Sequence, residues 1–167
     1  MRCKQILSSI AAAAGVARAE SGSPMQLDVF LSDVIATWKN DNLAIAFIAN
    51  IQNGNSPRIV AEYGLKQAII NLLDNAADVS PGFVQLDAKW TAQSLTIIIQ
   101  DKGNGIPPEI ASNTFDAGFT TKLNGLGLWL FLARSVITRL EGYLNFKQPS
   151  EGGTIAAITI PIKRLAV

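Results

Sequence analysis

The chain has 167 residues and a formal net charge of +1, and its 14 basic and 13 acidic residues are spread along its whole length. This length is enough for one domain with a substantial core, and the even charge is not the basic footprint that nucleic acid or acidic membranes require. With one cysteine and no histidine, the chain cannot form an internal disulfide, and it lacks the usual zinc ligands and the usual acid-base catalyst.

Residues 1–19 are predicted to form a helix, because apolar residues recur there at helical spacing. These residues are Ile6, Ile10, Ala13 and Ala17. The segment is also similar to a secretory signal, since Arg2 and Lys4 precede an alanine-rich stretch, so both interpretations stay open. Residues 20–24 have the composition of a linker, and residues 25–167 follow as the main domain.

The first half of this domain is predicted to contain a helix, a strand and a second helix. Residues 25–40 have a helical apolar period, and residues 43–51 form an apolar run of strand length before the turn-rich QNGNSP. Residues 59–79 are helical again, and the sequence SPG ends this helix. The residues expected on the two buried helix faces are Leu27, Phe30, Leu31, Val34, Ile35, Leu65, Ile69, Leu72, Leu73 and Ala76.

The second half is predicted to contain two hairpins and a long helix. Residues 83–90 and 94–101 pair as one antiparallel hairpin, and residues 143–148 and 154–162 pair as the other. Between them, residues 125–142 form a helix that glycines open and close. This order of elements indicates an α+β fold, a two-layer α/β sandwich in which a mixed, mostly antiparallel sheet carries helices on one face.

A polar stripe interrupts the apolar face of the second helix. In NLLDNAAD, helical spacing places Asn71, Asn75 and Asp78 at i, i+4 and i+7. A carboxamide oxygen can bind Mg²⁺, which is usually shared between one or two protein oxygens and the phosphates of a nucleotide. The alternative is that these side chains cap neighbouring backbone or face solvent.

Two glycine-containing segments add to this stripe. In DKGNGIPPE, Asp101 lies at a strand end, and Gly103 and Gly105 let the backbone approach a flat or charged ligand closely. In LNGLGLWL, glycines open a helix whose N-terminal amides can bind an anion. Each segment alone is equally consistent with a tight turn or a loop.

Five segments in order resemble the ATP-binding domain shared by sensor histidine kinases, gyrase, MutL and a heat-shock chaperone. They are NLLDNAAD, DKGNGIPPEI, FDAGFTTK, GLGLWLFLA and EGGTIAAITIPI, within residues 59–162. The motif sequences are most similar to those of histidine kinases, and TTK and GLGLWLFLAR resemble the RegB/PrrB redox-responsive group. The resemblance implies a Bergerat-type sandwich that holds ATP and Mg²⁺ between helices and a mobile lid.

The resemblance also implies a role for each matching residue. Asn71 would be the magnesium ligand, and Lys122 in the lid would contact the γ-phosphate, so these two are the expected catalytic residues. Asp101 would accept a hydrogen bond from the adenine amino group, and Thr154 would complete that contact through water. The implied nucleotide contacts are Asn75, Asp78, Asp101, Gly103, Gly105, Ile106, Phe119, Thr121, Gly125, Leu126, Gly127, Leu128 and Thr154.

Three departures from the family pattern affect the expected activity. Gln67 stands where hydrolytic members have a glutamate that activates water, and an amide has no useful basicity near neutral pH. This change favours transfer over hydrolysis. Asp78 replaces a basic residue of many histidine kinases, and the lid between Phe119 and Gly125 is short.

The expected function is therefore the catalytic domain of a sensor histidine kinase, which transfers the γ-phosphate to a histidine on a dimerisation domain. Residues 1–19 would be the end of a dimerisation helix, and a response regulator would be the downstream partner. Neither nucleic acid nor direct membrane contact is expected, and the location would be cytoplasmic within a membrane-anchored parent. The alternatives are a serine kinase of the anti-sigma type and a nucleotide-gated interaction module without transfer.

Overall fold

The computed structural model describes residues 22–105 and 126–167, apart from the side chains of residues 126–129 and 131. The main elements in chain order are β1 (Pro24–Gln26), α2 (Leu27–Asp41), β2 (Phe47–Ile51), β3 (Arg58–Val60), α3 (Tyr63–Val79), β4 (Val84–Trp90), β5 (Ser94–Asp101), α5 (Leu126–Arg139), β6 (Tyr143–Lys147), β7 (Ile155–Pro161) and the 3-10 helix Ile162–Arg164. No helix in these ranges is long and apolar enough to cross a membrane.

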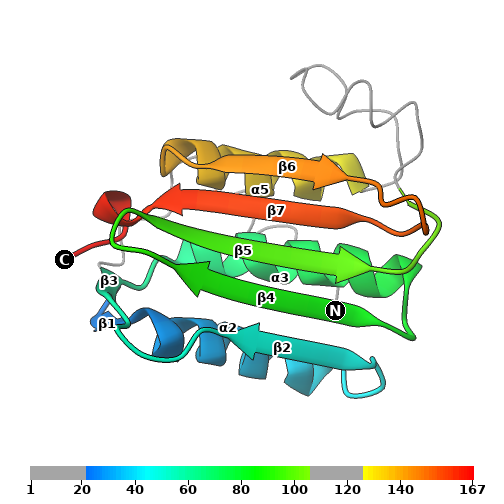
Figure 1. Cartoon of the computed structure of the whole chain (residues 1–167), viewed down its shortest axis with the longest axis horizontal. Coiled ribbons are helices and arrows are strands. Elements are labelled where there is room, and N and C mark those ends of the chain that lie inside the picture. Colours follow the sequence, from blue (N-terminus) through cyan, green and yellow to red (C-terminus); the bar gives the residue numbers. More distant parts are fainter. Residues whose placement is uncertain (1–21, 106–125) are drawn as a thin grey trace.

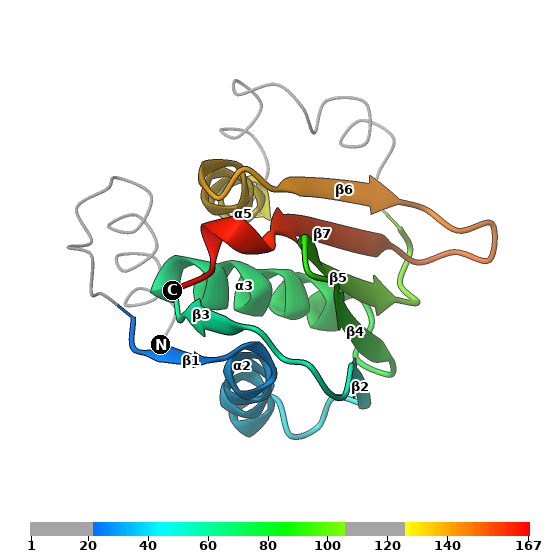
Figure 2. The same ribbon diagram turned by 60° about the vertical axis from the view of Figure 1, so that its left-hand side comes forward.

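A five-stranded mixed sheet forms one layer of the molecule, in the order β2-β4-β5-β7-β6. Only β2 and β4 pair in parallel, and the other three pairs are antiparallel. The helices α2, α3 and α5 cover one face of this sheet (Figures 1 and 2). The expected two-layer sandwich with a mostly antiparallel sheet is confirmed, as are its two hairpins.

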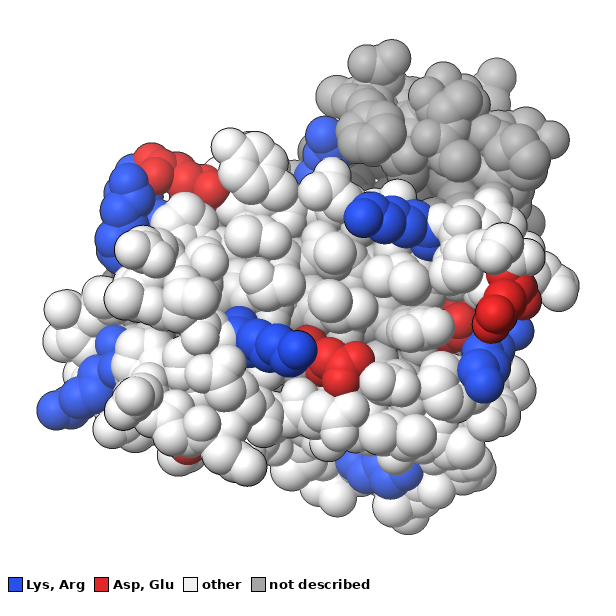
Figure 3. Space-filling view, in the orientation of Figure 1, with Lys and Arg blue, Asp and Glu red and all other residues white. Residues whose placement is uncertain are grey.

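The second face of the sheet carries few charges. In the space-filling view, lysine and arginine side chains are scattered among aspartate and glutamate, and neither sign forms a continuous patch on the visible described surface (Figure 3). On the described part of this face, the basic side chains are therefore not concentrated in one place.

The core lies between the sheet and the helices. Strands β4, β5 and β7 alternate buried and less buried residues, which is the period expected when one face of a sheet is covered. All the residues predicted on the buried helix faces are buried except Ile35, which is partly buried. Trp38 on α2 is also buried, although it is not among the residues predicted there.

Several predicted boundaries are wrong. Residues 58–60 form strand β3, so the helix predicted over residues 59–79 begins only at Tyr63. Strand β1 begins at Pro24, within the predicted linker over residues 20–24. This strand pairs antiparallel with β3. The strand predicted over residues 43–51 begins at Phe47. The helices predicted over 25–40 and 125–142 are α2 and α5, with ends shifted by one to three residues.

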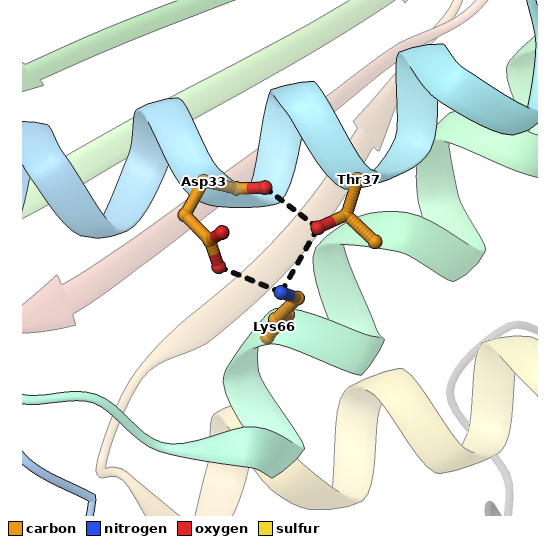
Figure 4. A network of polar contacts seen from close by, with 3 residues as sticks. All are labelled: Asp33, Thr37 and Lys66. Carbon is orange, nitrogen blue, oxygen red and sulfur yellow. Dashed lines mark hydrogen bonds and ion pairs between the residues drawn. The ribbon is translucent and has the colours of Figure 1, made fainter.

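An exposed polar network joins α2 to α3 (Figure 4). Lys66 Nζ lies 2.7 Å from Asp33 Oδ2 and 3.0 Å from Thr37 Oγ1, and the Thr37 hydroxyl donates to the Asp33 carbonyl at 2.8 Å. Such exposed ion pairs add little stability. The network does direct Lys66 toward α2, whereas its neighbour Gln67 bonds along α3.

A more buried contact between the same helices involves Trp38 and Asp74. The Trp38 indole Nε1 donates to Asp74 Oδ1 at 2.8 Å. Burial raises the pKa of Asp74, the Trp38 hydrogen bond opposes this, and the charges of Asp78 and Asp41 raise it further. A carboxyl with a raised pKa favours folding while protonated, and this contribution is lost as the pH rises through its folded-state pKa.

We therefore expect Asp74→Asn to unfold at a higher urea concentration than the wild type at pH 7. The amide keeps an oxygen for the indole and carries no charge that burial disfavours. The difference should shrink as the pH is lowered from 7 toward 4, where the wild-type carboxyl becomes protonated. Glu151→Gln, at an exposed carboxylate, is the control, and a pH-independent difference for Asp74→Asn would contradict the assignment.

Candidate functional site

Asp101 is a buried carboxylate at the end of β5. The alternation of this strand places its side chain on the helix-facing side of the sheet, in line with Leu95, Ile97 and Ile99. Only 5% of the residue is exposed. Because α3 packs on β5, Asp101 lies at the junction of the two layers.

Backbone amides hold one oxygen of this carboxylate. Asp101 Oδ1 accepts hydrogen bonds from the N–H groups of Gly103 at 2.8 Å and Thr154 at 3.1 Å. The Asp101 N–H in turn donates to the Thr154 carbonyl at 3.0 Å. Within the described residues Oδ2 has no donor, yet no fully buried side-chain oxygen there lacks a partner. Oδ2 therefore keeps some exposed surface and can accept a hydrogen bond from a ligand.

Glycines allow two turns to approach Asp101 closely. A Cβ on Gly103 would lie 2.7 Å from the Val79 carbonyl oxygen, so the turn after β5 packs directly against the last residue of α3. Gly153 has φ of +83°, and a Cβ there would lie 2.1 Å from the Asp101 carbonyl oxygen. A larger residue at either position would displace the backbone around the carboxylate.

Ser80 is a site residue that the sequence analysis missed. It is buried just beyond α3, where its hydroxyl donates to the Phe83 carbonyl at 2.8 Å and accepts from the Lys102 N–H at 3.1 Å. The residue thus ties the end of α3 to the turn that follows Asp101. A serine before proline at a helix end indicates a local turn, but nothing local identifies a partner 22 residues away.

The predicted polar stripe of α3 runs from the core to the surface. Asn71 is 7% exposed, Asn75 is half-buried, and Asp78 is exposed in the last turn of the helix. Gln67 Nε2 donates to Asn71 Oδ1 at 3.0 Å. A carboxamide is therefore buried at the point on the stripe where one was expected, and it has a partner one helical turn away.

The helices α3 and α5 run antiparallel, which brings the start of α5 toward the stripe. Arg139 Nη1 and Nη2 each donate to the Glu62 carboxylate at 2.9 Å, and this contact raises the pKa of Arg139. A Cβ on Gly64 would lie 3.4 Å from Val136, so the first turn of α3 meets the last turns of α5. Asn75 lies roughly 16 Å further along α3, toward the end of the molecule at which α5 begins.

Three features of the sequence thus meet at one end of the molecule. Val79 contacts the turn after Asp101, and Asn75 lies one helical turn before Val79. Because α3 and α5 run antiparallel, α5 begins at the same end of the molecule at which α3 ends (Figure 1). The N–H groups at that helix start carry partial positive charge and suit an anion. This end of the molecule therefore carries the Asp101 carboxylate and the start of α5, and the buried Asn71 amide lies about two helical turns back along α3.

Several predicted site residues lie outside the described residues. They are Ile106, Phe119, Thr121, Lys122 and Gly125. Leu126, Gly127 and Leu128 belong to the first turn of α5, but their side chains are not described. Thr154 is half-buried directly before β7, and Gly105 has φ of +78° in the turn after Asp101.

The sequence matches a known family and several curated proteins. The model of the family described as "Histidine kinase-, DNA gyrase B-, and HSP90-like ATPase" matches residues 61–164. The sensory histidine kinase/phosphatase NtrB of Azospirillum brasilense is 31% identical over 128 residues, which are 64% of this chain and 32% of that protein. Sporulation kinase A of Bacillus subtilis is 32% identical over 101 residues, which are 59% of this chain and 17% of that protein. The chain thus spans about a fifth to a third of the relatives it matches.

Solved structures share the fold. The nucleotide-free catalytic domain of the histidine kinase ThkA has a TM-score of 0.69 at 22% identity, covering 83% of this chain and 94% of that domain. The mycobacterial sensor histidine kinase MprB has a TM-score of 0.64 at 24% identity, covering 84% of this chain and 97% of that structure. At these identities the likeness establishes the fold, and function has to be argued from the site.

Proposed function

Since the chain belongs to the family of histidine kinase-, DNA gyrase B-, and HSP90-like ATPases, we propose that it transfers the γ-phosphate of ATP to a histidine of a separate dimerisation domain. It is the ATPase-type catalytic domain that sensor histidine kinases share, and its own sequence contains no histidine to accept the phosphate. The observation that supports the proposal is the buried Asp101 carboxylate, which two backbone amides hold through Oδ1 beside the end of α3, the helix that carries Asn71 on its buried side.

Asp101 is proposed to select adenine. Its Oδ2 accepts a hydrogen bond from the exocyclic amino group, while Oδ1 stays fixed by the Gly103 and Thr154 amides. Guanine presents a carbonyl oxygen at the same position, which would face a carboxylate with no proton between them. We also propose that the Thr154 side chain contacts adenine through a water molecule.

Asn71 is proposed to bind the magnesium ion that accompanies ATP. Mg²⁺ in nucleotide sites takes only one or two protein oxygens and keeps phosphate oxygens and waters as its other ligands. The buried amide oxygen of Asn71, on the helix that packs antiparallel to α5, fits this requirement. When bound, the ion neutralises charge that develops on the phosphates during transfer.

The remaining phosphate contacts are proposed from the family resemblance. Asn75 is proposed to contact the phosphates together with the start of α5, where Gly125, Leu126, Gly127 and Leu128 would offer backbone amides. Lys122 is the proposed γ-phosphate contact, and Phe119, Thr121 and Ile106 would belong to the lid and its base. Asp78 is exposed on the same stripe, and we keep it as a nucleotide contact.

The broader biological setting is also a proposal. Gln67 cannot act as a general base, which supports transfer over hydrolysis. The resemblance to the RegB/PrrB group is kept as the finer assignment, with a cytoplasmic location and a response regulator as the partner that receives the phosphate. Neither the serine-kinase alternative nor the interaction module is favoured by the comparisons.

The test is transfer of label from γ-labelled ATP, with Mg²⁺, to a purified dimerisation domain of a sensor kinase. We expect label on that domain that is lost in acid and retained in base, as for a phosphorylated histidine, and none when its histidine is replaced by glutamine. Acid-stable label would indicate the serine-kinase alternative. ATP binding without transfer to any dimerisation domain would indicate the interaction module.

A further inference from the structure

Gln67 and Asn71 form a pair of carboxamides on one side of α3. They are separated by four residues, so their side chains lie one above the other on the helix. Gln67 is the donor and Asn71 Oδ1 the acceptor, at 3.0 Å. Gln67 is half-buried and Asn71 is almost fully buried, so water competes little for the bond.

The direction of this hydrogen bond matters because the two ends of a carboxamide differ chemically. The oxygen can bind a metal ion and the NH₂ group cannot, although their shapes are nearly the same. Packing alone therefore does not choose which end of Asn71 faces the site. In the structure Gln67 presents its NH₂ group, and this group meets the Asn71 oxygen.

We propose that Gln67 is a positioning residue that holds the Asn71 oxygen in place as the magnesium ligand. The inference rests on the proposed function, in which Asn71 binds the ion. A carbonyl oxygen has two lone pairs, so one can accept from Gln67 while the other is directed at the metal. Partners that orient metal ligands in this way are worth about 10- to 100-fold in metal affinity.

Gln67→Met tests the proposal, because methionine keeps the length of the side chain and its helix propensity but has no donor. We expect the Mg²⁺ concentration that half-saturates ATP binding to rise about tenfold in calorimetric titrations. The affinity for ADP in EDTA and the melting temperature should stay as in the wild type. Gln93→Met makes the same chemical change in the exposed turn between β4 and β5, and it should leave the Mg²⁺ requirement, the ADP affinity and the melting temperature unchanged.

A double-mutant cycle shows whether Gln67 acts through Asn71. In an Asn71→Ala background, adding Gln67→Met should change the Mg²⁺ requirement by less than about twofold. Two independent, additive effects would overturn the positioning role, and so would an unchanged Mg²⁺ requirement in Gln67→Met alone. Loss of ADP binding in EDTA would also overturn it, because it would indicate a general structural role.

The wild-type protein separates this inference from the proposed function. If it binds neither ATP nor ADP, both the proposed function and the role of Gln67 are overturned. If it binds ATP with Mg²⁺ and transfers phosphate, but Gln67→Met leaves the Mg²⁺ requirement unchanged, only the inference about Gln67 fails.

Discussion

Replacing Asp101 with asparagine is expected to weaken ATP binding by roughly 100-fold, with Mg²⁺ present or absent. Two backbone N–H groups, of Gly103 and Thr154, require an acceptor at the Oδ1 position, so the asparagine oxygen must occupy it. The NH₂ group then replaces Oδ2 and meets the amino group of adenine as a second donor. Calorimetric titration with ADP in EDTA measures this loss directly.

The same variant should change the choice of base. An NH₂ group at the Oδ2 position can donate to the carbonyl of guanine, so the ratio of ATP to GTP affinity is expected to fall. Asp87→Asn is the matched control: Asp87 is on β4 and accepts bonds from Asn50 and Gln85. Intact adenine-nucleotide binding in Asp101→Asn, with its free energy of unfolding preserved, would remove Asp101 from the site.

The main elements were predictable because their patterns are local. Strand β5 alternates over its whole length, and α3 repeats its buried residues at helical spacing. Strand β3 has only three residues and no pattern of its own. Its formation depends on distant partners: Ile59 pairs with Met25 and bridges to Ala166, and the Val60 N–H donates to the Leu165 carbonyl. Such pairings depend on tertiary context rather than propensity.

The candidate site also contains residues that the sequence could identify and contacts that it could not. Asp101 and Asn71 were identifiable because each residue type has a clear chemistry at a strand end or on a helix stripe. The supporting contact of Asp101 was not, since Ser80 meets the Lys102 amide only once the fold is formed. Gln67 is intermediate, because its spacing from Asn71 could be read in the sequence but the direction of the hydrogen bond could not.

Asn71→Ala is expected to affect the opposite end of the site from Asp101→Asn. It removes the proposed magnesium ligand, so we expect phosphoryl transfer to a dimerisation domain to fall by about 100-fold or more. The adenine contact at Asp101 is untouched, and ADP should bind in EDTA with wild-type affinity. The free energy of unfolding should change by only about 1 kcal/mol, because a single hydrogen bond, that from Gln67, is lost and alanine favours the helix.

The two variants together distinguish a nucleotide site from a general loss of structure. Asp101→Asn should weaken nucleotide binding whether or not Mg²⁺ is present, whereas Asn71→Ala should weaken only the binding and transfer that depend on Mg²⁺. A damaged fold would reduce both kinds of binding in both variants, and a misassigned magnesium ligand would leave Asn71→Ala with wild-type transfer. The opposite pattern, with ADP binding in EDTA lost in Asn71→Ala and kept in Asp101→Asn, would place the base at the α3 stripe and reverse the proposed orientation of ATP.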